Sequence, residues 1–348
     1  MAIRRRTILL LAIVAGCSAI RLGSPSTVPT AFAVRSIVLP GGEGGSVAMD
    51  YLAYDRVHHR VWVPAGNTGT VDVVHVPDER VASVAGFATA EIERHGTKRI
   101  VGPSSATVGD GVVYVGNRGD SSVCAADAES LRVGACIKLD SSPDGLAYVR
   151  STREVWVTTP RDHSIVVIDT AAGALRWKAT IALDGQPEGF AVDDKRGVFY
   201  TNLEDKDRTL GIDTHSRQVT STWLPGCDED GPKGLALDVS RDFLVVACAD
   251  RVLLLDAGHD GKRLSTLHVG DGVDNIDYVE ERHELYVAAA RAATLTIARL
   301  DPQGGLTAQV TVPTVPGARN AVATDEGTAY LTDSSEGKIL VVAPVEPR

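Results

Sequence analysis

The sequence predicts an all-β fold, a seven-bladed β-propeller made of four-stranded antiparallel blades. A unit of four short strands recurs seven times, and its Pro-x-Gly segment stands at 143–145, 187–189 and 232–234, spacings of 44 and 45 residues. A fixed period of this length is typical of repeat architectures. The last unit lacks a fourth strand, whereas a spare strand at 34–39 precedes the first unit, so we expect the N-terminal strand to close the ring.

The individual strands follow from short runs rich in Val, Ile and aromatic residues, bounded by Gly, Asp and Pro. The first strands are expected at 49–53, 104–108, 143–148, 187–192, 232–237, 274–278 and 319–323. The second strands are expected at 61–63, 113–115, 155–157, 198–200, 244–246, 285–287 and 329–331. The third strands are expected at 70–76, 122–126, 165–168, 209–212, 252–255, 295–298 and 339–342. The fourth strands include 176–183 and 219–224. Together with the spare strand at 34–39, the seven units place the propeller at 34–348.

The N-terminus has the anatomy of an export signal. Three arginines at 4–6 precede a short apolar run that ends in Val-Ala-Gly-Cys, which resembles a bacterial lipobox with Cys17 as the lipidated residue. This interpretation gives a signal peptide at 1–16 and a flexible linker at 17–33, and a lipid anchor as the only membrane contact. The alternative is cleavage after the Ala-Phe-Ala segment that ends at Ala33. Both place the protein outside the cytoplasm, in the periplasm or at the outer membrane.

Four cysteines remain after Cys17, and an oxidising compartment favours their pairing. Cys124 and Cys136 flank one expected hairpin, and Cys227 and Cys248 fall at the same end of another blade. We therefore expect the disulfides Cys124–Cys136 and Cys227–Cys248, with free buried thiols as the alternative.

The second and third strands resemble those of YVTN-type (YncE-like) β-propellers. The resemblance rests on Tyr-Thr-Asn at 200–202, Trp-Val-Thr-Thr at 156–159, Tyr-Val-Gly-Asn at 114–117, Tyr-Leu-Thr-Asp at 330–333 and Val-Val-Ile-Asp at 166–169. It covers the chain past residue 34 and implies an exported propeller of unspecified activity. The unit at 245–248 departs from the pattern because it lacks the aromatic residue and the Asn.

One face of the ring, which we call the upper face, carries the loops between second and third strands and the loops between successive blades. Concave sites with a few convergent polar groups are the default binding sites of proteins. The polar residues expected there could also be merely solvated. The candidate ligand-binding residues are Asp50, Asn67, Asn117, Arg118, Asp144, Arg161, Glu188, Asn202, Lys233, Asn275, Arg291 and Asn320.

Metal chemistry at this face would depend on oxygen ligands. Most histidines fall in turns of the opposite face, and only His95 and His163 are expected near the site, so a zinc or copper centre is not expected. Glu188, Asp144 and Asn275, together with Asp50, are ligands that Ca²⁺ prefers. The architecture is similar to gluconolactonase-type propellers, which implies a Ca-dependent lactone hydrolase or a lyase as the alternative function. Lys233 in the same ring would compete with a metal for these carboxylates.

The composition narrows the range of partners. The formal net charge of −10 opposes binding to nucleic acid, and aromatic residues make up only 5% of the chain, which argues against an aromatic-lined groove. A charged insertion at 90–99 is expected on the upper face, where it is either a contact for a partner or an ordinary surface loop. The sequence therefore favours a monomeric binding module of the cell envelope that recognises a small molecule or an envelope protein, with no cofactor assigned other than Ca²⁺ in the alternative function.

Overall fold

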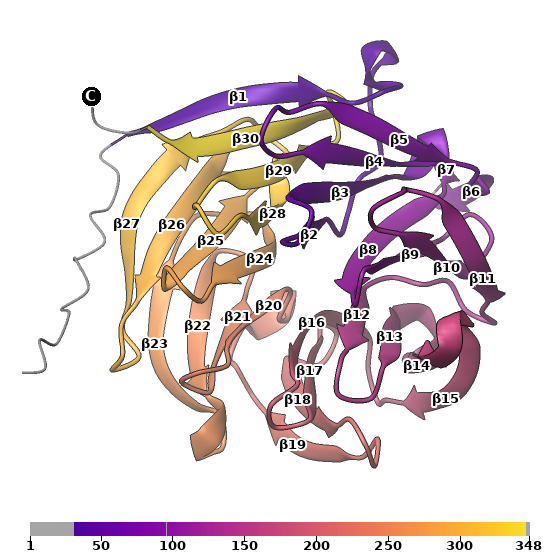
Figure 1. Ribbon diagram of the computed structural model, residues 1–348. Helices are drawn as coiled ribbons and strands as arrows, with labels where there is room; N and C mark the ends of the chain where they lie inside the picture. Colours follow the sequence, from indigo (N-terminus) through magenta and orange to yellow (C-terminus); the bar gives the residue numbers. More distant parts are fainter. Residues whose placement is uncertain (1–30, 95, 346–348) are drawn as a thin grey trace, which may run out of the picture.

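The chain folds into a closed ring of seven four-stranded antiparallel sheets, which confirms the predicted propeller (Figure 1). The computed structural model describes residues 31–94 and 96–345. An additional two-stranded hairpin, β6 (Ala90–Arg94) and β7 (Thr97–Val101), lies between the first two blades and is formed by the charged insertion. Within the described ranges, no helix is long and apolar enough to cross a membrane.

Each blade runs outward from the central axis through four strands. Blade 1 contains β2 (Ala53–Asp55), β3 (Arg60–Ala65), β4 (Thr70–His75) and β5 (Val81–Ala85), and blade 2 contains β8 (Pro103–Gly109), β9 (Val112–Asn117), β10 (Ser122–Asp127) and β11 (Val133–Lys138). Blade 3 contains β12 (Leu146–Val149), β13 (Glu154–Thr159), β14 (Ser164–Asp169) and β15 (Arg176–Ala182). Blade 4 contains β16 (Pro187–Asp193), β17 (Val198–Leu203), β18 (Arg208–Asp213) and β19 (Val219–Trp223).

The remaining three blades complete the ring. Blade 5 contains β20 (Leu235–Asp238), β21 (Phe243–Ala247), β22 (Arg251–Asp256) and β23 (Lys262–His268). Blade 6 contains β24 (Val273–Val279), β25 (Glu284–Ala289), β26 (Thr294–Leu300) and β27 (Leu306–Pro313). Blade 7 contains β28 (Arg319–Ala323), β29 (Ala329–Asp333), β30 (Lys338–Pro344) and, as its outermost strand, β1 (Phe32–Val38).

The N-terminal strand closes the ring as predicted. β1 pairs antiparallel with β30 in continuous register from Phe32 opposite Pro344 to Val38 opposite Lys338. It begins two residues earlier than the sequence predicts, so the last two residues of the expected linker belong to the sheet. The expected signal peptide, Cys17 and residues 17–30 of the linker lie outside the described residues.

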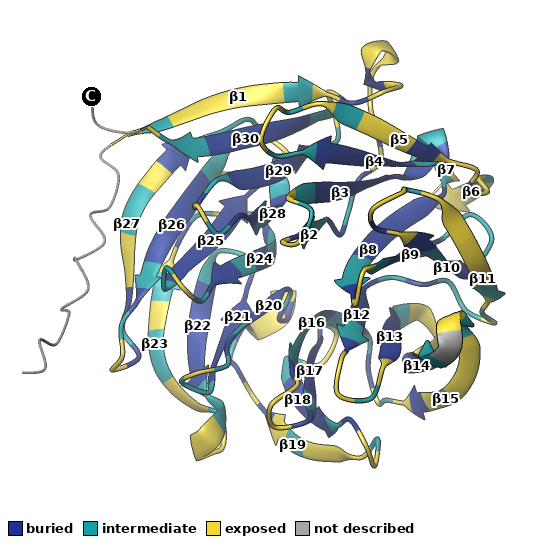
Figure 2. Cartoon of the chain, viewed as in Figure 1, coloured by how far each residue is buried: buried dark blue, intermediate teal, exposed yellow. Residues whose placement is uncertain are grey.

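The cores lie between neighbouring blades. Seven clusters of buried apolar residues each join the facing surfaces of two blades. For example, the rings of Trp156 in blade 3 and Phe199 in blade 4 stack with centroids 4.9 Å apart. Figure 2 shows the second and third strands largely buried, whereas outer strands such as β11, β19 and β1 are mostly exposed. This is why the aromatic residues that mark the repeats occupy the second strands.

The repeated Pro-x-Gly segment has a packing role at the axis. A Cβ atom on Gly145 would collide with Phe190 of the next blade, and one on Gly189 would collide with the carbonyl oxygen of Lys233. Glycine therefore allows the first strands to approach one another closely around the axis. The polar residue that precedes each glycine is consequently held beside the central channel.

Both predicted disulfides are present. Cys124 and Cys136 are directly opposite one another on β10 and β11, and the second bridge joins Cys227 to Cys248. The pairing excludes the alternative of free thiols at these four positions. Structural disulfides are typical of an oxidising compartment, outside the cytoplasm.

Candidate functional site at the channel mouth

The upper end of the central channel gathers charged side chains from all seven blades or their preceding loops. A cavity of about 200 Å³ in the channel is lined by residues that include Tyr51, Phe190, Ile276, Asn275 and Asn320. Around it stand the residues that we call the channel mouth: Asp50, Tyr51, Arg118, Asp144, Glu188, Lys233, Asp274, Asn275, Arg319 and Asn320.

Arg118 links two carboxylates across the mouth. It follows β9 and reaches inward, where its Nη2 donates to Asp50 Oδ2 at 3.0 Å and also to Asp144 Oδ1. Its Nε donates to the carbonyl oxygen of Pro143 at 3.3 Å. Burial opposes the charge of Arg118, but Asp144 and Asp50 outweigh it and raise the pKa of the guanidinium. For Asp144, burial is the larger influence, so its pKa is raised despite Arg118. This part of the mouth is a compact, paired cluster.

Glu188 lies beside this cluster without a cationic partner among the described residues. The Tyr51 hydroxyl donates to Glu188 Oε1 at 3.1 Å and lies 3.4 Å from Asp144 Oδ2. Burial raises the pKa of Glu188 well above its ordinary value, and the charges of Asp144, Glu204, Asp274 and Asp50 raise it further. Burial likewise raises the pKa of Tyr51. Tyr51 therefore remains a neutral donor that orients the Glu188 carboxyl.

The other side of the mouth is formed by blades 6 and 7. Arg319 Nη1 donates to Asp274 Oδ2 at 2.5 Å. Burial raises the pKa of Asp274 to about 6, although Arg319 acts against the shift. Asn320 Nδ2 donates to Asp50 Oδ1 at 3.0 Å, which ties blade 7 to the loop that enters blade 1. The Nδ2 of Asn275 is buried and has no partner among the described residues, so it is a donor available to a ligand.

The mouth carries an excess of negative charge. Lys233 Nζ donates to Glu204 Oε2 at 2.9 Å, and this pair adds no net charge. Among the described residues, Arg118 and Arg319 are the cations that pair with the remaining carboxylates Asp50, Asp144 and Asp274, and Glu188 pairs with neither. Carboxylates crowded in this way favour protonation or the arrival of a cation. Burial is the main cause of the raised pKa values of Asp144, Glu188 and Asp274, and the neighbouring carboxylates raise them further.

The arrangement does not fit a calcium site. In the described ranges, no three His, Cys, Asp or Glu side chains come close enough to hold one metal ion. The guanidinium of Arg118 occupies the space between Asp50 and Asp144, where a cation would have to bind. Calcium needs six to eight oxygen ligands around one point. We therefore derive no step through a metal.

The other predicted residues lie outside the channel mouth. Asn67 binds the backbone of residues 46 and 48, and Asn117 is buried and accepts from the backbone N–H of its own loop. Asn202 is fully buried and donates to the carbonyl oxygen of Lys233 at 2.6 Å. Arg161 is exposed, and Arg291 pairs with Asp271 in solvent. The structure thus brings together seven of the twelve candidates: Asp50, Arg118, Asp144, Glu188, Lys233, Asn275 and Asn320.

Sequence reasoning missed three members of the channel mouth. Tyr51, Asp274 and Arg319 each stand next to a predicted residue, at the start of a first strand where neighbouring side chains both reach the channel. The histidine assignment also needs correction, because His268 lies at the upper end of β23, exposed, with Nδ1 3.8 Å from Asp250 Oδ2. His163 is exposed in the loop after β13, and His95 lies outside the described residues.

Comparisons with known proteins support the fold alone. No family model matches the sequence, and no curated protein matches it. Among solved structures, a chain of the mitotic checkpoint complex superposes with a TM-score of 0.70 at 15% identity, over 94% of this chain and 98% of that one. Hydrazine synthase from Kuenenia stuttgartiensis gives 0.69 at 14% identity, over 86% and 95%. A catalytically inactive histidine-to-alanine variant of virginiamycin B lyase from Staphylococcus aureus, with quinupristin, gives 0.69 at 12% identity, over 90% and 100%.

Proposed function

We propose that this protein is an exported binding module whose channel mouth recognises a positively charged group, an ammonium or a guanidinium, on a small ligand. The observation that carries the proposal is the Glu188 carboxyl, which has a tyrosine hydroxyl as partner but no cation among the described residues, amid the charges of Asp144, Asp274 and Asp50. A ligand cation supplies the missing charge. Hydrogen bonds to charged groups contribute roughly 1.5–3 kcal/mol, enough to discriminate against an uncharged analogue.

The remaining parts of the proposal come from the sequence. Export to the cell envelope accords with the two disulfides and with the N-terminal segment. A lipid anchor at Cys17 and membership of the YVTN-type propellers belong to the same proposal. They rest on the lipobox-like segment and on the Tyr-Thr-Asn and related strand endings.

A binding role is favoured over a lyase role by the side chains present. Virginiamycin B lyase is described as inactive when one histidine becomes alanine. The channel mouth of this chain is instead built from carboxylates, arginines, one lysine, amides and one tyrosine. Asp50 and Asp144 pair with Arg118 and Asp274 pairs with Arg319, which leaves the Glu188 carboxyl as the group for a ligand cation.

Calorimetric titration of the full chain with 1,4-diaminobutane tests the proposal. Glu188→Gln keeps the shape and removes the charge, and we expect it to weaken binding about tenfold or more, the equivalent of roughly 1.4 kcal/mol. Glu93→Gln is the matched control, because Glu93 is exposed on the β6–β7 hairpin, and its variant should bind like the native chain. No saturable binding to the native protein, or equal affinities for the two variants, would refute the proposed function.

A further inference from the structure

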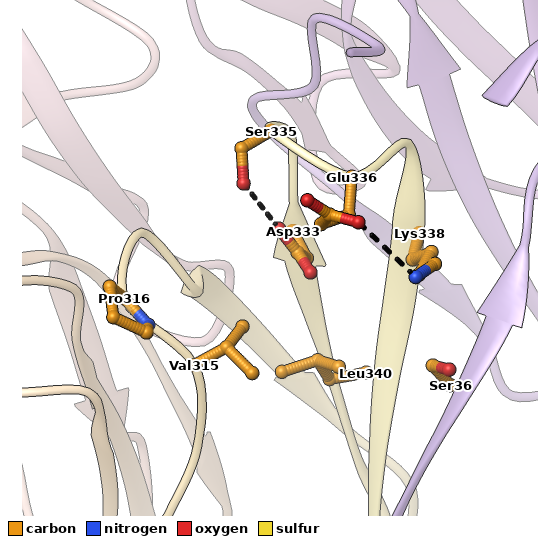
Figure 3. Close-up of a pocket in the computed structure, with 8 residues that line it drawn as sticks. All are labelled: Ser36, Val315, Pro316, Asp333, Ser335, Glu336, Lys338 and Leu340. Atoms are coloured by element: carbon orange, nitrogen blue, oxygen red, sulfur yellow. Dashed lines mark hydrogen bonds and ion pairs between the residues drawn. The ribbon is translucent and has the colours of Figure 1, made fainter. Parts of the chain in front are cut away.

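A second hollow lies on the upper face, away from the channel, between the loops that follow β27 and β29. It has a volume of about 460 Å³, a size common for small-molecule sites, and shares no lining residue with the channel cavity. Val315, Pro316 and Leu340 form an apolar wall, whereas Asp333, Ser335 and Ser36 supply polar groups (Figure 3). We call this hollow the rim cavity.

Asp333 is the unusual residue of the rim cavity. It is the last residue of β29 and is 2% exposed, yet within the described part of the chain no Lys, Arg or His side chain lies within ion-pairing distance of it. One of its oxygens accepts from the Ser335 hydroxyl at 2.9 Å. Burying a carboxylate without a counter-charge is unfavourable unless something else binds it.

The repeat shows that the fold does not need a carboxylate at this position. Asp333 is the residue that closes the sheet just before the loop between second and third strands. The six equivalent residues are uncharged: Ala65, Asn117, Thr159, Leu203, Cys248 and Ala289. The charge is therefore a feature of blade 7 and is not a requirement of blade geometry.

The neighbouring lysine does not neutralise Asp333. Lys338 is directly opposite Asp333 in the β29–β30 register, but its Nζ lies 3.4 Å from Glu336 Oε2 instead. Figure 3 shows Lys338 directed toward Glu336, with the Asp333 carboxyl between this pair and the apolar wall. An oxygen of Asp333 is thus left for a ligand.

We propose that the rim cavity binds a small primary amine with a short hydrocarbon body. The ammonium group would donate to the Asp333 carboxylate and the Ser335 hydroxyl, and the hydrocarbon would pack on Val315, Pro316 and Leu340. An ammonium is a compact donor that can bind a single carboxylate. Burial of the ligand's hydrocarbon against the apolar wall stabilises the complex further. The site is independent of the channel mouth and of the function proposed for it.

NMR titration of the ¹⁵N-labelled full chain with n-butylamine tests this site. We expect saturable shifts of the Ser335 and Lys338 amides, with n-butanol producing none, at the millimolar affinity expected of so small a ligand. Asp333→Asn should weaken binding about tenfold or more, since the charge-assisted bond is lost. Glu326→Gln, at an exposed residue on the lower face of the same blade, is the matched control and should bind like the native protein.

Two further variants make the result decisive. Val315→Lys introduces a competing ammonium from a partly exposed loop and should also abolish the rim shifts, even if Asp333→Asn folds poorly. Glu188→Gln removes the key carboxylate of the channel mouth and should leave the rim shifts unchanged, which separates the two proposals. Shifts confined to the channel mouth, or equal binding by the native protein and both rim variants, would overturn the inference.

Discussion

Asp274 should make the stability of the ring fall as the pH rises through the mildly acidic range. Its pKa in the folded protein is about 6, above the ordinary 3.8, mainly because the carboxyl is buried. The folded state therefore holds this proton more tightly than the unfolded state does. The favourable contribution is fully present below about pH 4 and is lost as the pH rises to about 6.

The size of the effect follows from the shift. A difference of about two pKa units corresponds to about 3 kcal/mol in the free energy of unfolding, an upper limit for a side chain that keeps some contact with water. Asp274→Asn removes the titration while keeping the shape. The variant should therefore gain stability relative to the native chain by up to about 3 kcal/mol between about pH 4 and pH 7.

Urea-induced unfolding, followed by tryptophan fluorescence over this pH range, measures the difference. Asp271→Asn is the matched control, because Asp271 is exposed and its bond to Arg291 lowers its pKa. That variant should show no gain above pH 4. If the difference between Asp274→Asn and the native chain stays constant within about 0.5 kcal/mol, the typical scatter of surface substitutions, the electrostatic reasoning is wrong.

Three other outcomes follow from the contacts. Arg118→Met leaves two facing carboxylates unpaired and should lower the free energy of urea unfolding by about 3 kcal/mol, and an unchanged value would show that the pair is not coupled. Asn202→Ala breaks a buried link between blades and should lose about 1–3 kcal/mol, whereas a loss below that range would mean that the link is dispensable. Replacing Cys227 and Cys248 together by Ser should lose about 3 kcal/mol, measured as a lower midpoint in urea, and an unchanged midpoint would contradict a structural role.

The ring could be predicted from the sequence because its signals are local and repeated. The period of the Pro-x-Gly segment, the strand runs and the spare strand at the N-terminus each report on one blade, and together they specify closure. The disulfides followed from the same register, since Cys124 and Cys136 stand on adjacent strands. The structure then explains the glycine of the repeat through contacts between blades that a single unit does not reveal.

The channel mouth was predicted only in part because its contacts join residues far apart in the chain. Asn202 and Asn117 resemble ligand-binding residues in sequence, but the structure uses them to satisfy buried backbone groups. Tyr51 shows the opposite case. An aromatic residue at the start of a repeat is expected to pack in the core, but the Tyr51 hydroxyl donates to Glu188 and orients its carboxyl. The lone carboxylate of Asp333 has no sequence signature beyond a comparison with the six equivalent positions.

The most direct test of the account is the pH dependence of 1,4-diaminobutane binding, measured by calorimetry on the native full chain and on Glu188→Gln. Because the pKa of Glu188 is raised, binding of a cation there is coupled to loss of the Glu188 proton. We expect the affinity of the native chain to increase as the pH is raised and binding to release a proton, with both effects reduced in Glu188→Gln. An affinity that is independent of pH, or the same pH dependence in the variant, would contradict the assignment of Glu188 as the residue that receives the cation.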